Sequence, residues 1–328
     1  MKCVDAHSDI LNDITAKRTR GETDIFHNYH FERLKKGEIE GSIWVIWADA
    51  NSENGFSYEE RTKQIIKCAN DEINSASDFR VVHNYEEMMK AREEGIFYVF
   101  LGVEGMAYIG DDIDRLNDYY DLGARHGILT WNESNTLASG VNSGVNTGLT
   151  PLGKEVVKRM EELHMIVDVS HLNEAGFWDI ASIASKPFIA SHSNCTALCG
   201  VPRNLTDEQL RAIRDCNGVV GLNAYAGFVS ADPRKQTIEK LAEHAGHIID
   251  IMGIDHVMCG FDFCEFIEGD ISGGSPIADK TNPNVTGLET AEYVQSLFDV
   301  FDSMGMSKAD QEKIAYKNIH RIIRDVIG

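Results

Sequence analysis

The chain has neither an excess of positive charge nor a long apolar run. Its 328 residues include 31 Lys and Arg against 52 Asp and Glu, which gives a formal net charge of −21. Nucleic acids and anionic membranes bind positively charged protein surfaces, so this balance argues against both as partners. No stretch reaches the roughly 20 apolar residues that span a bilayer, and no apolar signal region precedes the first predicted strand. We therefore expect a cytoplasmic protein.

The sequence also lacks a disulfide framework. Its seven cysteines are an odd number, lie scattered between Cys3 and Cys264, and include no Cys-x-x-Cys pair. Reduced thiols in a cytosolic protein fit this pattern best. Internal repeats, low-complexity stretches and proline-rich linkers are absent as well. The hydrophobic content of 43% and the length allow a large core, and we expect a single domain over residues 1–328.

Short apolar runs alternate with longer amphipathic ones along the chain. Eight apolar runs predict strands over residues 3–10, 41–48, 97–103, 127–131, 165–169, 187–191, 218–223 and 256–261. Helical patterns between them include 58–76, 152–163, 207–215 and 237–252, and residues 290–327 predict two closing helices. This alternation predicts an α/β fold, a (β/α)₈ TIM-like barrel. A doubly wound open sheet is the rival, but no Gly-x-Gly-x-x-Gly turn follows the first strand.

Polar residues follow the apolar runs at their C-terminal ends. In (β/α)₈ barrels the catalytic residues come from that end of the strands. Seven of the predicted strands carry such a residue, which is hard to attribute to chance. The residues are His7, Asp9, Glu104, Asn132, His171, His192, Tyr225 and Asp262.

The first predicted strand carries Asp5, His7 and Asp9 at every second position. The alternation of a strand places all three side chains on one face. Two carboxylates and an imidazole on a buried face need compensation, and a divalent metal at the end of a barrel strand supplies it. A half-exposed edge strand is the alternative.

Three imidazoles and two carboxylates are the candidate metal ligands: His7, Asp9, Glu104, His171 and His192. Ligands of this kind suit zinc, with cobalt or manganese as substitutes. Five ligands exceed what one tetrahedral zinc with an open water position needs, so two ions bridged by Glu104 are expected. Taken singly, the histidines have other roles open to them, since His171 could cap the following helix and His192 could be a core residue.

Eight segments are informative as an ordered set: Asp5-Ala6-His7-Ser8-Asp9, Gly102-Val103-Glu104-Gly105, Val167-Asp168-Val169-Ser170-His171, Ser191-His192-Ser193, Arg203-Asn204-Leu205-Thr206-Asp207, Gly260-Phe261-Asp262-Phe263, Gly287-Leu288-Glu289 and Asn318-Ile319-His320-Arg321. Together they resemble the membrane (renal) dipeptidase family, the M19 zinc peptidases. No single motif is decisive, but the set spans nearly the whole chain in order. The resemblance implies a barrel of the metallo-dependent hydrolase type that holds two zinc ions.

The resemblance also implies the reaction, which is hydrolysis of the peptide bond of free dipeptides by a metal-bridging hydroxide. Dipeptides with a D-residue at the C-terminal position are included. By analogy, His7 and Asp9 bind the first ion, His171 and His192 bind the second, and Glu104 bridges them.

Three further residues receive roles from the resemblance. Asp262 is similar to the family's acid/base aspartate, and a carboxylate beside a metal-bound nucleophile suits proton transfer. A merely orienting role for Asp262 is the alternative. Arg203 matches the arginine that binds the free C-terminal carboxylate of the substrate, a group that suits a guanidinium fork, although it could also be a surface residue in a turn. Tyr225 is expected to line the substrate pocket.

Two positions depart from the family pattern. Asn132 stands where the family has a histidine that polarises the substrate carbonyl, and an asparagine amide can still donate a hydrogen bond to an oxyanion. We therefore count Asn132 among the catalytic candidates. Cys264 stands where relatives often have a second aspartate, which could alter the surroundings of the metal ions or of Asp262.

Two other functions remain open at this stage. An amidohydrolase acting on another small amide or a cyclic amide would share the barrel, but such enzymes have an early His-x-His motif, whereas this chain has His7-Ser8-Asp9. A non-catalytic barrel that has lost its activity is the third reading, and the presence of all five candidate ligands weighs against it. By family analogy we expect a homodimer and a bacterial, cytoplasmic relative.

Overall fold

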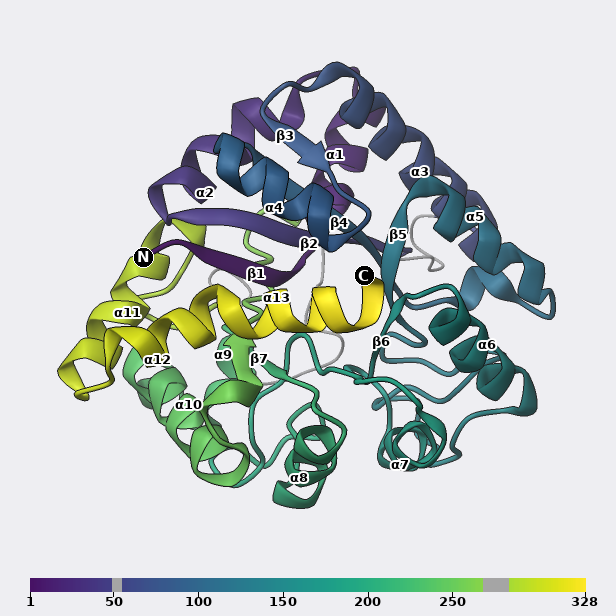
Figure 1. The fold of residues 1–328 in the computed structure, drawn as a ribbon. Helices are drawn as coiled ribbons and strands as arrows, with labels where there is room; N and C mark the ends of the chain where they lie inside the picture. Colours follow the sequence, from purple (N-terminus) through teal and green to yellow (C-terminus); the bar gives the residue numbers. More distant parts are fainter. Residues whose placement is uncertain (49–54, 268–282) are drawn as a thin grey trace.

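The computed structural model describes residues 1–48, 55–267 and 283–328. Within them, parallel strands lie in the order β1 (Cys3–Ser8), β2 (Ile39–Trp47), β4 (Phe97–Glu104), β5 (Ala124–Ile128) and β6 (Ile166–Asp168). A second parallel pair consists of β7 (Val220–Leu222) and β8 (Val257–Cys259). The strands curl around a common centre with helices on the outside (Figure 1). The structure therefore confirms the predicted α/β barrel.

Residues 189–190 join the two sets of strands. Ile189 bridges to Asp168 at the end of β6, and Ala190 bridges to Val220 at the start of β7. The strand predicted over residues 187–191 is therefore wrong in extent, although its place in the ring is right. The reason lies at Ser191, whose backbone N–H donates to the carboxylate of Asp168 at 3.2 Å instead of continuing a ladder.

Two glycines allow a close backbone approach at this junction. A Cβ atom on either Gly221 or Gly260 would lie 1.7 Å from the carbonyl oxygen of Ser191. A residue with a side chain at either position would therefore displace the segment that precedes His192. His171, the candidate ligand that follows β6, is positioned instead by the turn after Asp168.

A side chain completes the ring between β8 and β1. The Oδ1 atom of Asp5, in the middle of β1, accepts a hydrogen bond of 2.8 Å from the N–H of Phe261, which follows β8. Asp5 is 2% exposed, and burial raises the pKa of its carboxyl group to about 7. This carboxylate links the first and last strands of the barrel.

The helices lie around the strands. Their bounds are α1 (Ile10–Thr19), α2 (Glu32–Lys36), α3 (Tyr58–Ser75), α4 (Tyr85–Glu94), α5 (Leu116–Leu122), α6 (Pro151–Glu162), α7 (Glu174–Ile183), α8 (Asp207–Asp215), α9 (Ala226–Val229), α10 (Ile238–Met252), α11 (Val294–Ser303), α12 (Lys308–Glu312) and α13 (Asn318–Ile322). The four helices predicted individually from the sequence correspond to α3, α6, α8 and α10, and the tail forms two helical stretches as predicted. No helix in the described ranges is both long and apolar enough to span a bilayer.

Capping residues define where two of the predicted helices begin. The Ser57 hydroxyl accepts the N–H of Glu60 while the Glu60 carboxylate accepts the N–H of Ser57, which satisfies two free amides at the start of α3. Thr206 and Gln209 form the same capping box at the start of α8. The short strand β3 (Phe79–Val81) was not predicted. It pairs with β4 outside the barrel order, and its three residues are too few to give a periodic signal.

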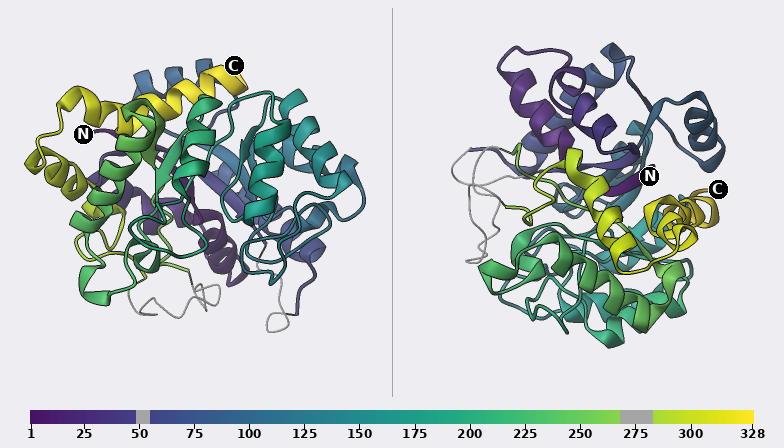
Figure 2. Two further views of the ribbon diagram at one scale, coloured as in Figure 1. Left: turned by 90° about the horizontal axis from the view of Figure 1, so that it is seen from below. Right: turned by 90° about the vertical axis from the view of Figure 1, so that its left-hand side faces the viewer.

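The C-terminal helical segment closes one end of the barrel, the end at which the strands begin. It crosses this end in Figure 1 and lies along one edge of the molecule in Figure 2, left. The Tyr98 hydroxyl lies 2.9 Å from Nε2 of His320, and apolar side chains of the segment pack against the starts of the strands. The packed residues include Val4, Ile43, Ile166, Val219, Met258, Ile319, Ile322, Ile323 and Val326. The end where the strands finish is not covered by this segment.

Candidate metal centre

Strand β1 brings His7 and Asp9 to the carboxyl end of the barrel. His7 is fully buried near the end of β1, and Asp9 lies between the strand and α1. Nε2 of His7 and Oδ2 of Asp9 are 3.8 Å apart. Asp5, the third residue of the alternating pattern, takes no part in this cluster because its carboxylate closes the ring of strands.

Glu104 lies at the centre of the cluster, as the last residue of β4, and is 2% exposed. Its Oε2 atom is 3.4 Å from Nε2 of His7. Its Oε1 atom is 2.8 Å from Nε2 of His171 and 3.5 Å from Nε2 of His192. The two oxygens of one carboxylate therefore face different imidazoles.

His171 and His192 present the same ring atom to the centre. Their Nε2 atoms are 2.9 Å apart, while their Nδ1 atoms are bound elsewhere. Nδ1 of His171 lies 3.0 Å from Oδ1 of Asn132, and Nδ1 of His192 lies 2.8 Å from Oγ of Ser191. Partners of this kind fix the orientation of a ring and leave Nε2 to the metal. Asn132 is thus beside the candidate ligands, as predicted, with its oxygen on His171.

Asp262 follows β8 and faces the same centre. Its Oδ1 atom lies 3.8 Å from Nε2 of His7, and its Oδ2 atom accepts a 2.9 Å hydrogen bond from the side-chain amide of Asn223. Both Asp262 and His171 have left-handed backbones, with φ of 58° and 65°. This conformation is uncommon for residues other than glycine and persists only where surrounding contacts hold it.

The donor set fits a metal ion. In the described part of the chain, two sets of ligand atoms lie within 4.8 Å of one another, those of His7, Glu104 and His192 and those of His7, Asp9 and Asp262. Both ring nitrogens of His7 and Oε1 of Glu104 are buried and have no hydrogen-bond partner of good geometry among the described residues. Buried polar atoms without partners are costly, and nitrogen with carboxylate oxygen is a ligand set that zinc prefers.

The electrostatics of the cluster agree with this fit. Burial by itself lowers the pKa of His7, but the carboxylates of Glu104 and Asp262 raise that pKa to about 10. Burial and the nearby Arg203 lower the pKa of His171 to about 4, so this ring is neutral and can act as a ligand. Burial, opposed by His7, raises the pKa of Asp262 to about 6. A cation at this centre would stabilise the excess of negative charge around His7.

Arg203 and Tyr225 lie next to the cluster. Arg203 is 7% exposed, its Nη2 atom is 3.4 Å from the carbonyl oxygen of His192, and its guanidinium lies 5.2 Å from the centre of the Phe228 ring. No carboxylate within the described ranges forms an ion pair with it. The ring of Tyr225 packs against Phe228 with centroids 4.7 Å apart.

A small cavity of about 50 Å³ opens beside the cluster. Aromatic rings form part of its wall, and two of them, Trp47 and Trp131, have centroids 5.0 Å apart. Six of the residues singled out from the sequence line it: Asp9, Glu104, Asn132, His171, Tyr225 and Asp262. Cys264, which departs from the family pattern, lines it too.

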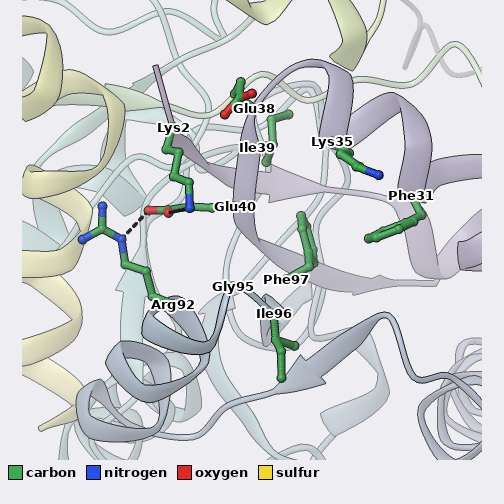
Figure 3. A pocket seen from close by; sticks show the side chains of 10 residues that line it. All are labelled: Lys2, Phe31, Lys35, Glu38, Ile39, Glu40, Arg92, Gly95, Ile96 and Phe97. Carbon is green, nitrogen blue, oxygen red and sulfur yellow. Dashed lines mark hydrogen bonds and ion pairs between the residues drawn. The ribbon is translucent and has the colours of Figure 1, made fainter.

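A second pocket, of about 230 Å³, lies at the other end of the barrel, where β1, β2 and β4 begin (Figure 3). Its central carboxylate, Glu40, is already neutralised, because Nε of Arg92 lies 2.7 Å and Nζ of Lys2 3.7 Å away. The pocket contains no histidine among its lining residues. It therefore offers no alternative to the cluster around Glu104.

The structure also identifies supporting residues that the sequence analysis did not single out. Asp168, fully buried, accepts hydrogen bonds from His126 at 2.7 Å and from the backbone N–H groups of Ser170 and Ser191 at 2.8 and 3.2 Å. Each of these serines directly precedes a candidate ligand. The side-chain amide of Asn223 donates a hydrogen bond to the carboxylate of Asp262. The sequence gives only a weak signal for such supporting residues, since a single polar residue at the end of a buried strand is common.

The model of the membrane dipeptidase family, peptidase family M19, matches residues 1–327. The chain belongs to this family. Its members are metal-dependent, so the predicted enzyme class, a metallo-dipeptidase, is confirmed.

Individual M19 relatives agree with the assignment. The chain is 34% identical over 261 residues to an uncharacterized protein from the pqqA 5′ region of Klebsiella pneumoniae, covering 77% of this chain and 90% of that protein. It is 26% identical to the dipeptidase tcpJ of Claviceps purpurea, covering 98% and 76%. The crystal structure of a metallopeptidase, dipeptidase AC, matches with a TM-score of 0.87 and 25% identity, covering 100% of this chain and 99% of that one.

The buried ion pair beneath the cluster leads to a prediction about stability. Burial raises the pKa of Asp168, but the His126 hydrogen bond outweighs this effect and holds the pKa well below its usual value. Asp168→Ala would leave His126 and two backbone N–H groups buried without an acceptor. We expect a loss of about 3–5 kcal/mol in the free energy of unfolding, measured by urea denaturation. Asp71→Ala, which removes an exposed partner of Lys67, is the control and should change little; an equally small effect at Asp168 would contradict the prediction.

Proposed function

We propose that this M19 enzyme is a dinuclear zinc dipeptidase that hydrolyses free dipeptides. The observation that carries the proposal is the position of Glu104, whose Oε2 faces His7 while its Oε1 faces His171 and His192. A carboxylate in this position can be shared by two ions. His7 and Asp9 would then hold one ion, and His171 and His192 the other.

Zinc ions bound there would lower the pKa of a water molecule to near neutrality and polarise the carbonyl of the substrate. The chain's own residues must then supply the proton transfers and the binding of the dipeptide. We assign these tasks to three residues: Asp262, Asn132 and Arg203.

Asp262 is the proposed acid/base. The amide of Asn223 holds its Oδ2, which leaves Oδ1 directed toward His7 and the centre. From this position the carboxylate accepts the proton of the attacking water and passes it to the nitrogen of the leaving amine. A carboxylate beside a metal-bound nucleophile suits both steps.

Asn132 has two groups available for two tasks. Its oxygen lies on Nδ1 of His171 and orients that ring. Its amide nitrogen, on a side chain that lines the cavity, is our candidate for donating a hydrogen bond to the developing oxyanion. Tyr225 also lines this cavity, which we propose as the space for the substrate.

Arg203 is the proposed binding site for the C-terminal carboxylate of the substrate. A buried guanidinium without an ion-pair partner in the described part of the chain is costly, and a carboxylate compensates it with parallel hydrogen bonds. The distance from this guanidinium to the centre then fixes how many residues fit beyond the scissile bond. One residue fits in a dipeptidase. The configuration of that residue is not fixed by this contact, so we include a D-residue among the substrates.

The test is hydrolysis of a dipeptide panel by zinc-loaded protein. We expect cleavage of L-Ala-L-Ala and L-Ala-D-Ala, loss of that cleavage with a chelator, and recovery on adding zinc back. Amidated L-Ala-L-Ala, which lacks the free carboxylate, should have a kcat/KM at least about a hundredfold lower, because a charge-assisted pair is lost. Absence of cleavage by protein carrying two zinc ions per chain would overturn the proposal and favour another small amide as the substrate.

Glu104→Gln tests the shared carboxylate. An uncharged amide cannot neutralise two cations, so we expect the variant to lose both zinc ions and its activity. The measurement is zinc content per chain after dialysis, by elemental analysis. Retention of both ions with wild-type kcat would show that Glu104 does not hold them together.

Asp262→Asn tests the proton transfer. The variant keeps the size of the side chain and its contact with Asn223, so both zinc ions should remain. We expect kcat to fall by about 10² to 10⁴, the usual contribution of a general acid/base. A kcat near the wild-type value with full zinc content would assign Asp262 an orienting role only.

A further inference from the structure

A larger cavity, of about 400 Å³, adjoins the candidate metal centre. His171 lines both this cavity and the small one beside Glu104, so the two cavities share a candidate metal ligand in their walls. Arg203 lines the larger cavity. A dipeptide whose peptide bond lies at the centre and whose carboxylate reaches Arg203 would therefore have its C-terminal residue at this wall.

Most polar side chains of this wall are used within the protein. The amide of Asn173 donates to the carbonyl oxygens of Val145 and Thr147. The hydroxyl of Thr196 donates to the carbonyl oxygen of Leu205. These groups hold the wall in shape and are not available to a ligand.

Two polar atoms of the wall differ from the others. Oγ of Ser193 and Nε of Arg203 are buried and have no hydrogen-bond partner among the described residues. Ser193 is 1% exposed and Arg203 is 7% exposed. The backbone of Ser193 is fixed by a 2.8 Å hydrogen bond from its N–H to the carbonyl oxygen of Gly221. The hydroxyl is therefore rigidly held but unused, and leaving such a group unpaired is costly.

Ser193 and Arg203 line the same cavity and are close along its wall. Nη2 of Arg203 lies 3.4 Å from the carbonyl oxygen of His192, the residue immediately before Ser193. One is a cationic donor and the other a neutral hydroxyl that can also donate. A carboxylate has two oxygens and only accepts, so it satisfies both donors at once.

We propose that Ser193 is a substrate-binding residue whose hydroxyl, together with Nε of Arg203, receives the C-terminal carboxylate of the dipeptide. This inference rests on the proposed function and adds a residue to it. The hydroxyl fixes the second carboxylate oxygen and thereby the position of the C-terminal residue in the larger cavity. An amidated C-terminus has one acceptor oxygen in place of two and no negative charge, so it would bind this pair of donors more weakly.

Steady-state kinetics of Ser193→Ala with zinc-loaded protein test this role. We expect KM for L-Ala-L-Ala to rise roughly tenfold to a hundredfold, the effect of losing a hydrogen bond to a charged group, while kcat stays within about twofold. The low kcat/KM for the amidated dipeptide should change little, since that substrate offers the hydroxyl no charged acceptor. Ser193→Thr keeps the hydroxyl and should keep KM near the wild-type value.

Two controls separate binding from structure. Ser42→Ala removes another buried serine, in β2 and away from the cavity, so it shows what this substitution costs in melting temperature alone. Zinc content per chain shows whether the neighbouring His192 is disturbed. If Ser193→Ala does not fold, Ser193→Cys, which replaces the hydroxyl by a weak donor of similar size, is measured in the same way.

The outcomes are distinct. An unchanged KM, an equal loss for free and amidated substrates, or a loss of zinc would each overturn the role of Ser193 while leaving the dipeptidase proposal in place. A wild-type enzyme with two zinc ions that cleaves no dipeptide would overturn both. A rise in KM confined to substrates with a free carboxylate is the result that supports the inference.

Discussion

The carboxylate of Glu104 is the constraint on which the rest of this site depends. It lies at the end of a strand buried on both sides, where an isolated charge would cost several kcal/mol. Burial raises its pKa, but His7 and His171 hold that pKa well below the usual value, so the group remains charged. Three imidazoles converge on this one charge, and two of them are themselves kept neutral by burial. The metal ions that we propose for this centre would balance the charge of these carboxylates.

A second layer of buried polar groups makes this convergence possible. The carboxylate of Asp168 accepts hydrogen bonds from the backbone N–H groups of the residues before His171 and His192. The side-chain amide of Asn223 donates to Asp262. These contacts come from residues within or just beyond the strands, not from the outer helices. The precision of the site is therefore a property of the barrel itself, as expected where ligands depend on fixed neighbours for their orientation.

The sequence was most informative where strand periodicity and residue chemistry coincided. His7 and Asp9 lie at the end of the first predicted strand and Glu104 follows an apolar run, so their position at one end of a barrel could be predicted. Asp5 shows the limit, because alternation assigns it to the same face but cannot reveal that its carboxylate binds the N–H of Phe261, 256 residues away. The segment 187–191 shows the same limit. Its apolar run predicts a strand, but the sequence cannot reveal that the N–H of Ser191 donates to the carboxylate of Asp168.

Residues whose proposed role depends on a buried donor without a hydrogen-bond partner cannot be identified from the sequence. Ser193 is one of several serines near histidines, and only the structure shows that its hydroxyl has no partner in the described part of the chain. The same holds for the left-handed backbones of His171 and Asp262, which cost about 1–3 kcal/mol each. The barrel tolerates such costs because its opposite end is closed by apolar packing under the C-terminal helix. One end of the ring supplies stability, so the other can hold unpaired donors and strained turns where we propose that the substrate binds.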